Sequence, residues 1–163
     1  MRLQVVFRYI GMVLLFESAF MLLSAIISYA NGIDGGFAPL LLSFLFTALL
    51  GSFPLIFVDK SSRLSSKESY AIVIGAWLFS CVVGTFPYLL WGGEFSILNA
   101  WFESVSGFTA TGASILNDIE ALPKGLLFWR SVTQWIGGVG IVLFALVIMP
   151  MIDRSRMTVS NME

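Results

Sequence analysis

Long apolar segments dominate the chain and leave few folds open to it. Four of them run from about Val5 to Ala30, Phe37 to Val58, Tyr70 to Trp91 and Gly125 to Pro150. A helix needs about 20 mostly apolar residues to cross a lipid bilayer. All four segments meet this length, and only 12% of the residues are charged. The sequence therefore predicts an all-α integral membrane protein with several spans.

The first apolar segment also has a second interpretation, as a cleaved signal peptide. Arg2 and Arg8 resemble the basic start of such a peptide, and residues 28–30 resemble a cleavage site. The apolar core of a signal peptide has about 7 to 15 residues. This segment is longer and contains Glu17, so an uncleaved membrane helix is favoured.

A shorter apolar segment, Ser96 to Phe108, lies between the third and fourth spans. As a helix it would rise about 20 Å, which is less than the bilayer core of about 30 Å. The small and polar sequence SGFTATGAS follows, at residues 106–114. Irregular backbone at membrane depth is tolerated only where protein buries it or where it lines a water-filled cavity. The pattern predicts a re-entrant segment whose carbonyl groups bind a cation; the alternative is an ordinary loop.

The distribution of basic residues predicts the orientation in the membrane. They gather at the N-terminus, in residues 59–69 and in the C-terminal residues 153–163. Residues 31–36 and 92–124 carry a single lysine between them and are acidic. Basic loops remain in the cytoplasm. Both termini are therefore expected to be cytoplasmic, and the re-entrant segment is expected to enter from the outside.

Two long motifs resemble a known family. FESVSGFTATGAS, at residues 102–114, and LPKGLLFWRSVTQWIGGVGIVLFALVIMP, at residues 122–150, closely resemble the Trk/Ktr/HKT superfamily of potassium transporters, above all its Trk-type membrane subunits. These proteins build one pore from four repeats of span, pore helix, filter and span, after two additional helices. The resemblance implies that residues 1–69 hold the two additional helices and a cytoplasmic loop. Residues 70–163 would then be the first repeat with a cytoplasmic tail.

The resemblance also implies a selectivity filter whose backbone binds the transported potassium ion, at Thr109, Ala110, Thr111 and Gly112. Glycine at position 112 is associated in this family with potassium preference, and serine with sodium passage. Support for the filter is expected from Glu103, Ser106, Gly107 and Arg130. Glu103 is expected to pair with Arg130, or else to concentrate cations near the filter. Arg130 could instead extend to the outer membrane interface.

Further expectations concern residues away from the filter. Because the family places its first two helices outside the pore, we expect Glu17 to form a buried hydrogen bond to another helix. The single cysteine, Cys81, is expected to pack as a small apolar residue. The glycines at 137, 138 and 140 indicate close helix packing or, alternatively, a hinge. The tryptophans at 91, 101 and 129 fit an aromatic belt at the outer interface.

The implied function is potassium transport across a bacterial cytoplasmic (inner) membrane, with no enzymatic activity. The sequence has no histidine and no catalytic motif. Potassium is the only ligand implied, with no organic cofactor and no nucleic acid. The implied partners are three further repeats or further copies, membrane lipids and a cytoplasmic nucleotide-binding regulatory protein. The alternatives are a short homotetrameric potassium channel and a non-conducting membrane assembly fragment.

Overall fold

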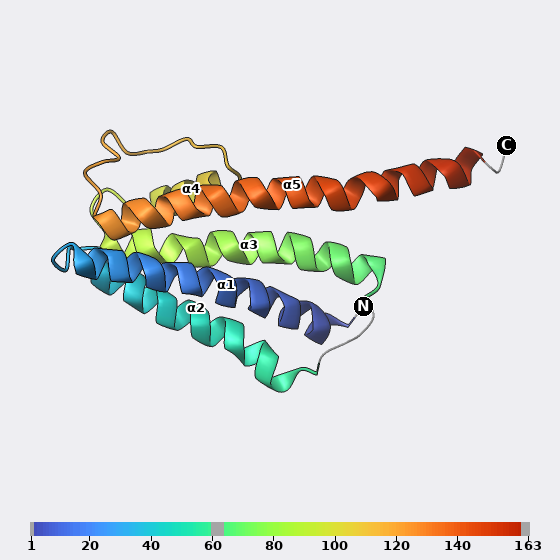
Figure 1. The fold of residues 1–163 in the computed structure, drawn as a ribbon, viewed down its shortest axis with the longest axis horizontal. Coiled ribbons are helices and arrows are strands. Elements are labelled where there is room, and N and C mark those ends of the chain that lie inside the picture. The colour runs from blue at the N-terminus through green and yellow to red at the C-terminus, as the bar shows by residue number, and fades with distance from the viewer. Residues whose placement is uncertain (1, 60–63, 161–163) are drawn as a thin grey trace.

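The structure is a computed structural model that describes residues 2–59 and 64–160, with side chains described as far as Val142. These residues form helices and no strand, which confirms the all-α prediction (Figure 1). The helices are α1 (Leu3–Ala30), α2 (Phe37–Phe57), α3 (Ser66–Trp91), α4 (Ile97–Phe108) and α5 (Lys124–Ser160). Two of the basic residues that predict the orientation, Lys60 and Arg63, lie outside the described residues, as do residues 161–163. The side chains of Arg154 and Arg156 are likewise not described.

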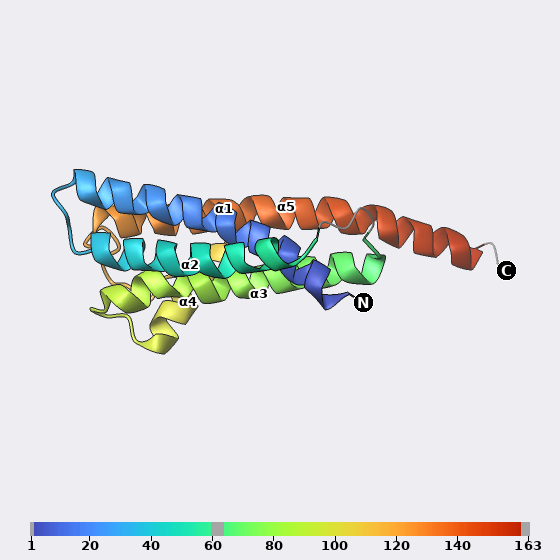
Figure 2. The ribbon, with the colours of Figure 1, turned by 90° about the horizontal axis from the view of Figure 1, so that it is seen from below.

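Four long helices lie side by side, and the short α4 packs against α3 and α5 (Figures 1 and 2). The α1–α2 turn, the α3–α4 turn and the start of α5 all lie at one end of the bundle, opposite the N-terminus. Helices α1, α2 and α3 are long and apolar enough to cross a membrane. The fourth predicted span lies within α5, and its crossing of the membrane stays a prediction.

Two helix boundaries differ from those predicted. Helix α3 begins at Ser66 rather than Tyr70, because Ser65 and Glu68 form a capping box that adds a polar first turn. Helix α5 does not end at Pro150 but continues to Ser160. Proline is tolerated inside membrane helices when neighbouring groups bind the freed carbonyl. Pro54 and Pro87 likewise lie inside α2 and α3.

Polar contacts at two depths hold α1 within the bundle. The fully buried Glu17 on α1 accepts a hydrogen bond from Ser80 on α3, which confirms the expected contact with another helix. At the turn, the Asp34 carboxylate accepts a hydrogen bond from the backbone N–H of Lys124 over 2.8 Å. Because Lys124 is the first residue of α5, Asp34 fixes the start of α5 against the α1–α2 turn.

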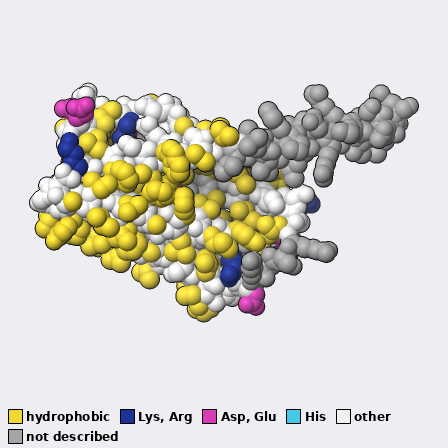
Figure 3. Space-filling model, in the orientation of Figure 1, with side chains coloured by type: hydrophobic (Ala, Val, Ile, Leu, Met, Phe, Trp, Pro, Cys, Tyr) yellow, Lys and Arg dark blue, Asp and Glu magenta, His cyan; other side chains and the backbone are white. Residues whose placement is uncertain are grey.

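The outer surface is largely apolar. In Figure 3, hydrophobic side chains cover the middle of the visible face, and charged side chains gather toward its two ends. Leu49, Ile56 and Phe57 are between 70% and 74% exposed. An exposed apolar area of this size is unusual for a soluble monomer. In a membrane protein, the lipid bilayer covers such a surface. The surface therefore agrees with the predicted membrane location.

Candidate functional site

Helix α4 ends where glycine allows three helices to approach closely. A Cβ atom placed on Gly107 would lie 2.3 Å from Thr133 Oγ1 on α5. One placed on Gly84 of α3 would lie 2.5 Å from Cε2 of Phe108. Both distances are far shorter than van der Waals contact, so a side chain at either position would push α4 outward. The two glycines thereby fix the depth of the end of α4 between α3 and α5.

The backbone folds back on α4 directly after Phe108. The amides of residues 109–111 donate hydrogen bonds to carbonyl oxygens of residues 105–107, with N–O distances between 2.8 and 3.0 Å. Carbonyls at a helix end usually lack such partners. The turn therefore satisfies three of the last four carbonyls of α4 and directs the chain away from the helix axis.

The fourth carbonyl, that of Phe108, is bound by a side chain that sequence analysis missed. The indole Nε1 of Trp77 on α3 donates to Phe108 O over 2.8 Å. The same carbonyl is approached from α5, because a Cβ on Gly137 would lie 2.6 Å from it. Trp77 gave no signal in the sequence, since a single tryptophan within an apolar span is ordinary. Its role appears only when α3 and α4 are brought together.

The predicted filter, residues 109–112, is exposed and has an unusual backbone. Ala110 has a φ of 52° and Gly112 a φ of 75°. This left-handed region is uncommon for residues with a Cβ and is easily adopted by glycine. The Thr109 and Thr111 hydroxyl oxygens lie 2.8 Å apart. Strained, exposed backbone directly beside a buried helix end is typical of a functional site.

Behind the predicted filter, one buried carboxylate joins three parts of the chain. Glu103 on α4 is 1% exposed, and its Oε1 accepts from Arg130 Nε on α5 over 2.6 Å. Both of its oxygens accept from the Ser114 hydroxyl, and Oε2 accepts from the backbone N–H of Ile115 over 3.3 Å. The predicted pair is therefore present. The Arg130 side chain is 13% exposed, so it pairs rather than extending to the interface.

Ser106 adds a second connection. Its hydroxyl donates to the carbonyl oxygen of Ala113 over 2.6 Å. Together with the contacts of Glu103, this bond ties the chain after Gly112 back to α4. The structure thus brings all eight predicted site residues into one region, in which residues 109–112 are exposed and most of the supporting side chains are buried.

One expectation about tryptophan is wrong. Trp129 does not belong to an interfacial belt but is fully buried, with its indole Nε1 3.4 Å from the carbonyl oxygen of Gly84. Its ring packs edge-on against Phe108. Trp101, in contrast, is 40% exposed. Trp129 therefore supports the end of α4 from within the protein.

Comparisons with known proteins agree with this architecture. Residues 39–163 match the family described as TrkH, cation transport protein. The chain is 30% identical to the Trk system potassium uptake protein TrkH of Vibrio parahaemolyticus, over all of this chain and 34% of that protein. It is 40% identical to an uncharacterized cation transporter of Methanocaldococcus jannaschii, over 79% of this chain and 27% of that one.

A solved structure shows the same arrangement of helices. The crystal structure of the potassium transporter TrkH from Vibrio parahaemolyticus matches with a TM-score of 0.84 and 30% identity. The match covers 92% of this chain and 32% of that one. The chain thus spans about a third of the length of these relatives.

Proposed function

The chain belongs to the TrkH family of cation transport proteins, and on that premise we propose that it contributes the first of four filter repeats to a potassium-transporting pore. One observation carries the proposal: the exposed backbone of residues 109–112, with left-handed conformations at Ala110 and Gly112, held at the end of a buried short helix. The relative from Vibrio parahaemolyticus is a potassium uptake protein, and we extend potassium transport to this chain as part of the proposal.

In this proposal, the carbonyl oxygens of Thr109, Ala110, Thr111 and Gly112 replace water around a potassium ion. The C-terminal end of α4 carries a partial negative charge that favours a nearby cation. Glu103, Ser106, Gly107 and Arg130 act on the filter indirectly, by holding its two ends. Glu103 pairs with Arg130 and Ser106 binds the Ala113 carbonyl directly after the filter, which supports a positioning role for these side chains.

The proposal extends to the organisation of the whole transporter. Residues 1–69 form the additional pair of helices with a cytoplasmic loop, and residues 70–163 form the first repeat. The chain is a multi-pass membrane protein, and we place both termini in the cytoplasm. Three further repeats complete the pore, and a nucleotide-binding protein regulates it from the cytoplasm.

The test replaces Gly112 with serine in the complete native polypeptide, expressed in bacteria that lack their own potassium uptake systems. We expect the ratio of potassium to sodium uptake to fall several-fold, because a Cβ at this left-handed position changes the direction of its carbonyl.

Gly92→Ser is a matched control. Gly92 is also left-handed, with a φ of 79°, and at Gly92, as at Gly112, an added Cβ would have no atom within 4 Å, but Gly92 lies outside the filter. Its substitution should leave the ratio unchanged. An unaltered ratio in Gly112→Ser would contradict the assignment of the filter.

A further inference from the structure

Helices α1 and α2 meet most closely at two glycines and separate beyond them. A Cβ on Gly11 would lie 2.5 Å from the carbonyl oxygen of Gly51, and one on Gly51 would lie 2.8 Å from that of Gly11. Small residues allow membrane helices to cross at this short distance. Toward its C-terminal end, α2 diverges from α1 and α3 (Figure 1). The divergence leaves a groove between the start of α1, the end of α2 and the middle of α3.

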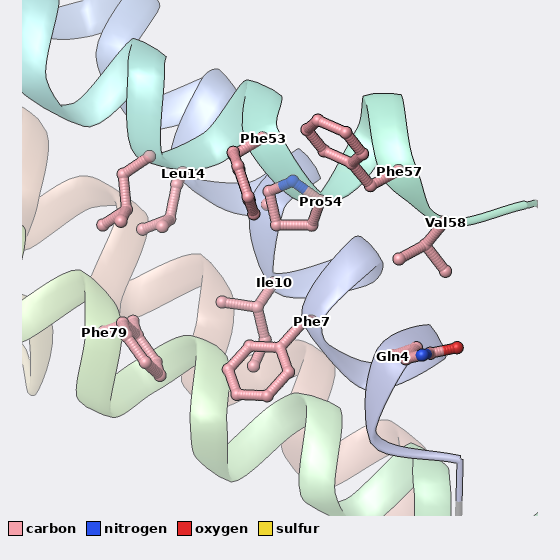
Figure 4. Close-up of a pocket in the computed structure, with 11 residues that line it drawn as sticks. Gln4, Phe7, Ile10, Leu14, Phe53, Pro54, Phe57, Val58 and Phe79 are labelled. Carbon is pink, nitrogen blue, oxygen red and sulfur yellow. The ribbon is translucent and has the colours of Figure 1, made fainter.

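The groove is large and almost entirely apolar. Its volume is about 350 Å³, within the range of about 300 to 1,000 Å³ found for small-ligand sites. Phe7 and Phe79, whose rings pack edge to face, line one side, and Phe53 and Phe57 lie across from them on α2 (Figure 4). Among the described residues that line it, only Gln4 has a polar side chain.

The groove has the length of one bilayer leaflet. Its lining residues on α1 extend from Gln4 to Leu14, a rise of about 15 Å, which is half of a hydrocarbon core of about 30 Å. Phe79 lies at the middle of α3, and Val58 directly follows α2. The groove therefore runs from the middle of the bundle to the end that carries the N-terminus.

Arg8 does not line the groove itself, but its guanidinium binds the carbonyl of the lining residue Val58 at this end and has no carboxylate partner. Arg8 Nη1 donates to the carbonyl oxygen of Leu55 over 2.9 Å and also to that of Val58. Within residues 2–59 and 64–142, no carboxylate lies within ion-pair distance of Arg8. Arg2 differs, because it pairs with Glu68. The exposed Asp59 directly follows Val58 but is not within ion-pair distance of Arg8.

We propose that the groove binds an anionic phospholipid, with one acyl chain between α1 and α2 and the headgroup phosphate at the level of Arg8. An apolar space one leaflet long with a cation at its outer end is complementary to such a lipid. Guanidinium groups bind phosphate strongly, and basic residues at the membrane surface attract anionic lipids. A tightly packed protein helix is less suitable, because Phe53 and Phe57 project where helix packing favours small residues.

The site is tested by native mass spectrometry on the complete native polypeptide. The protein is reconstituted in vesicles of equal parts phosphatidylglycerol and phosphatidylcholine with identical acyl chains, and then extracted in mild detergent. We expect the unaltered protein to retain one more phospholipid than Leu50→Trp, in which an indole fills the groove. Leu49→Trp is the matched control, because Leu49 is 70% exposed and does not line the groove. Leu49→Trp should retain as many phospholipids as the unaltered protein.

The role of the charge is tested separately. Arg8→Gln should reduce the preference for phosphatidylglycerol over phosphatidylcholine several-fold, and Arg8→Lys should preserve most of it. Equal lipid retention by Leu50→Trp and Leu49→Trp would overturn the proposal, even if Arg8→Gln does not fold. A benzophenone introduced at Phe57 should crosslink to lipid; crosslinking to another protein helix instead would also overturn it. None of these outcomes depends on whether the protein transports potassium.

Discussion

Glu103 is the residue on which most of the contacts behind the proposed filter converge. It is buried with Arg130, and removal of one partner leaves the other charge uncompensated. Breaking such a buried pair costs about 3 to 5 kcal/mol. We therefore expect Glu103→Gln to lower the free energy of unfolding by about 3 kcal/mol. The measurement is denaturant unfolding of the protein in micelles, followed by circular dichroism.

Two further variants test this explanation. Glu120→Gln changes an exposed carboxylate and should alter stability by less than about 0.5 kcal/mol. In the double variant Glu103→Gln with Arg130→Gln, the free energy of unfolding should fall by less than the sum of the decreases in the two single variants. The reason is that no unpaired charge remains buried. Strict additivity would show that the two side chains stabilise the protein independently.

Trp77 provides the second prediction for a single residue. Trp77→Phe keeps an aromatic ring but removes the hydrogen bond to the Phe108 carbonyl. We expect the free energy of local opening at the end of α4 to fall by about 1 kcal/mol. Amide exchange in this region should then be roughly five-fold faster. Hydrogen exchange of the amides in residues 105–116 measures this directly. Trp101→Phe, at an exposed position, should leave these rates unchanged, and unchanged rates in Trp77→Phe would exclude the role proposed for its indole.

At the scale of elements, neighbouring glycines of α5 have different surroundings. A Cβ on Gly137 would lie 2.6 Å from the Phe108 carbonyl, whereas one on Gly138 would have no atom within 4 Å. Gly137→Ala should therefore destabilise the protein by about 1 to 3 kcal/mol. Gly138→Ala should stabilise it by several tenths of a kcal/mol, because alanine favours the helix. The measurement is the thermal unfolding midpoint of both variants. Equal changes in the midpoint would favour a hinge over close packing.

The elements of this fold are easier to predict from the sequence than the contacts between them. Apolar length predicted the positions of α1, α2 and α3, and the shorter apolar segment Ser96 to Phe108 predicted the short α4. The polar first turn of α3 was missed although its signal, serine followed three residues later by glutamate, was present at Ser65 and Glu68. Trp77 and Asp34 were missed for another reason. Their partners, Phe108 and Lys124, are distant in the sequence, and no local pattern specifies such contacts.

At the scale of the whole molecule, the proposed filter residues of this chain would form one side of a site. Residues 109–112 are exposed, and a carbonyl filter for potassium requires several such segments around an axis. We therefore expect residues 1–163, purified alone into vesicles, to give no rubidium uptake above that of protein-free vesicles. The complete native polypeptide should give clear uptake. Flux through the isolated chain, with crosslinks between four copies, would instead support the homotetrameric channel.

Two of the long-range contacts of α5 also set an order of events during synthesis. Asp34 and Glu103 leave the ribosome before their respective partners, Lys124 and Arg130, which are 90 and 27 residues later. An unpaired carboxylate is costly within a bilayer. Glu103 therefore has no stable place at membrane depth until the start of α5 has been synthesised. We therefore expect α4 and the proposed filter to enter the membrane after α3 and α5, out of the order in which the ribosome produces them.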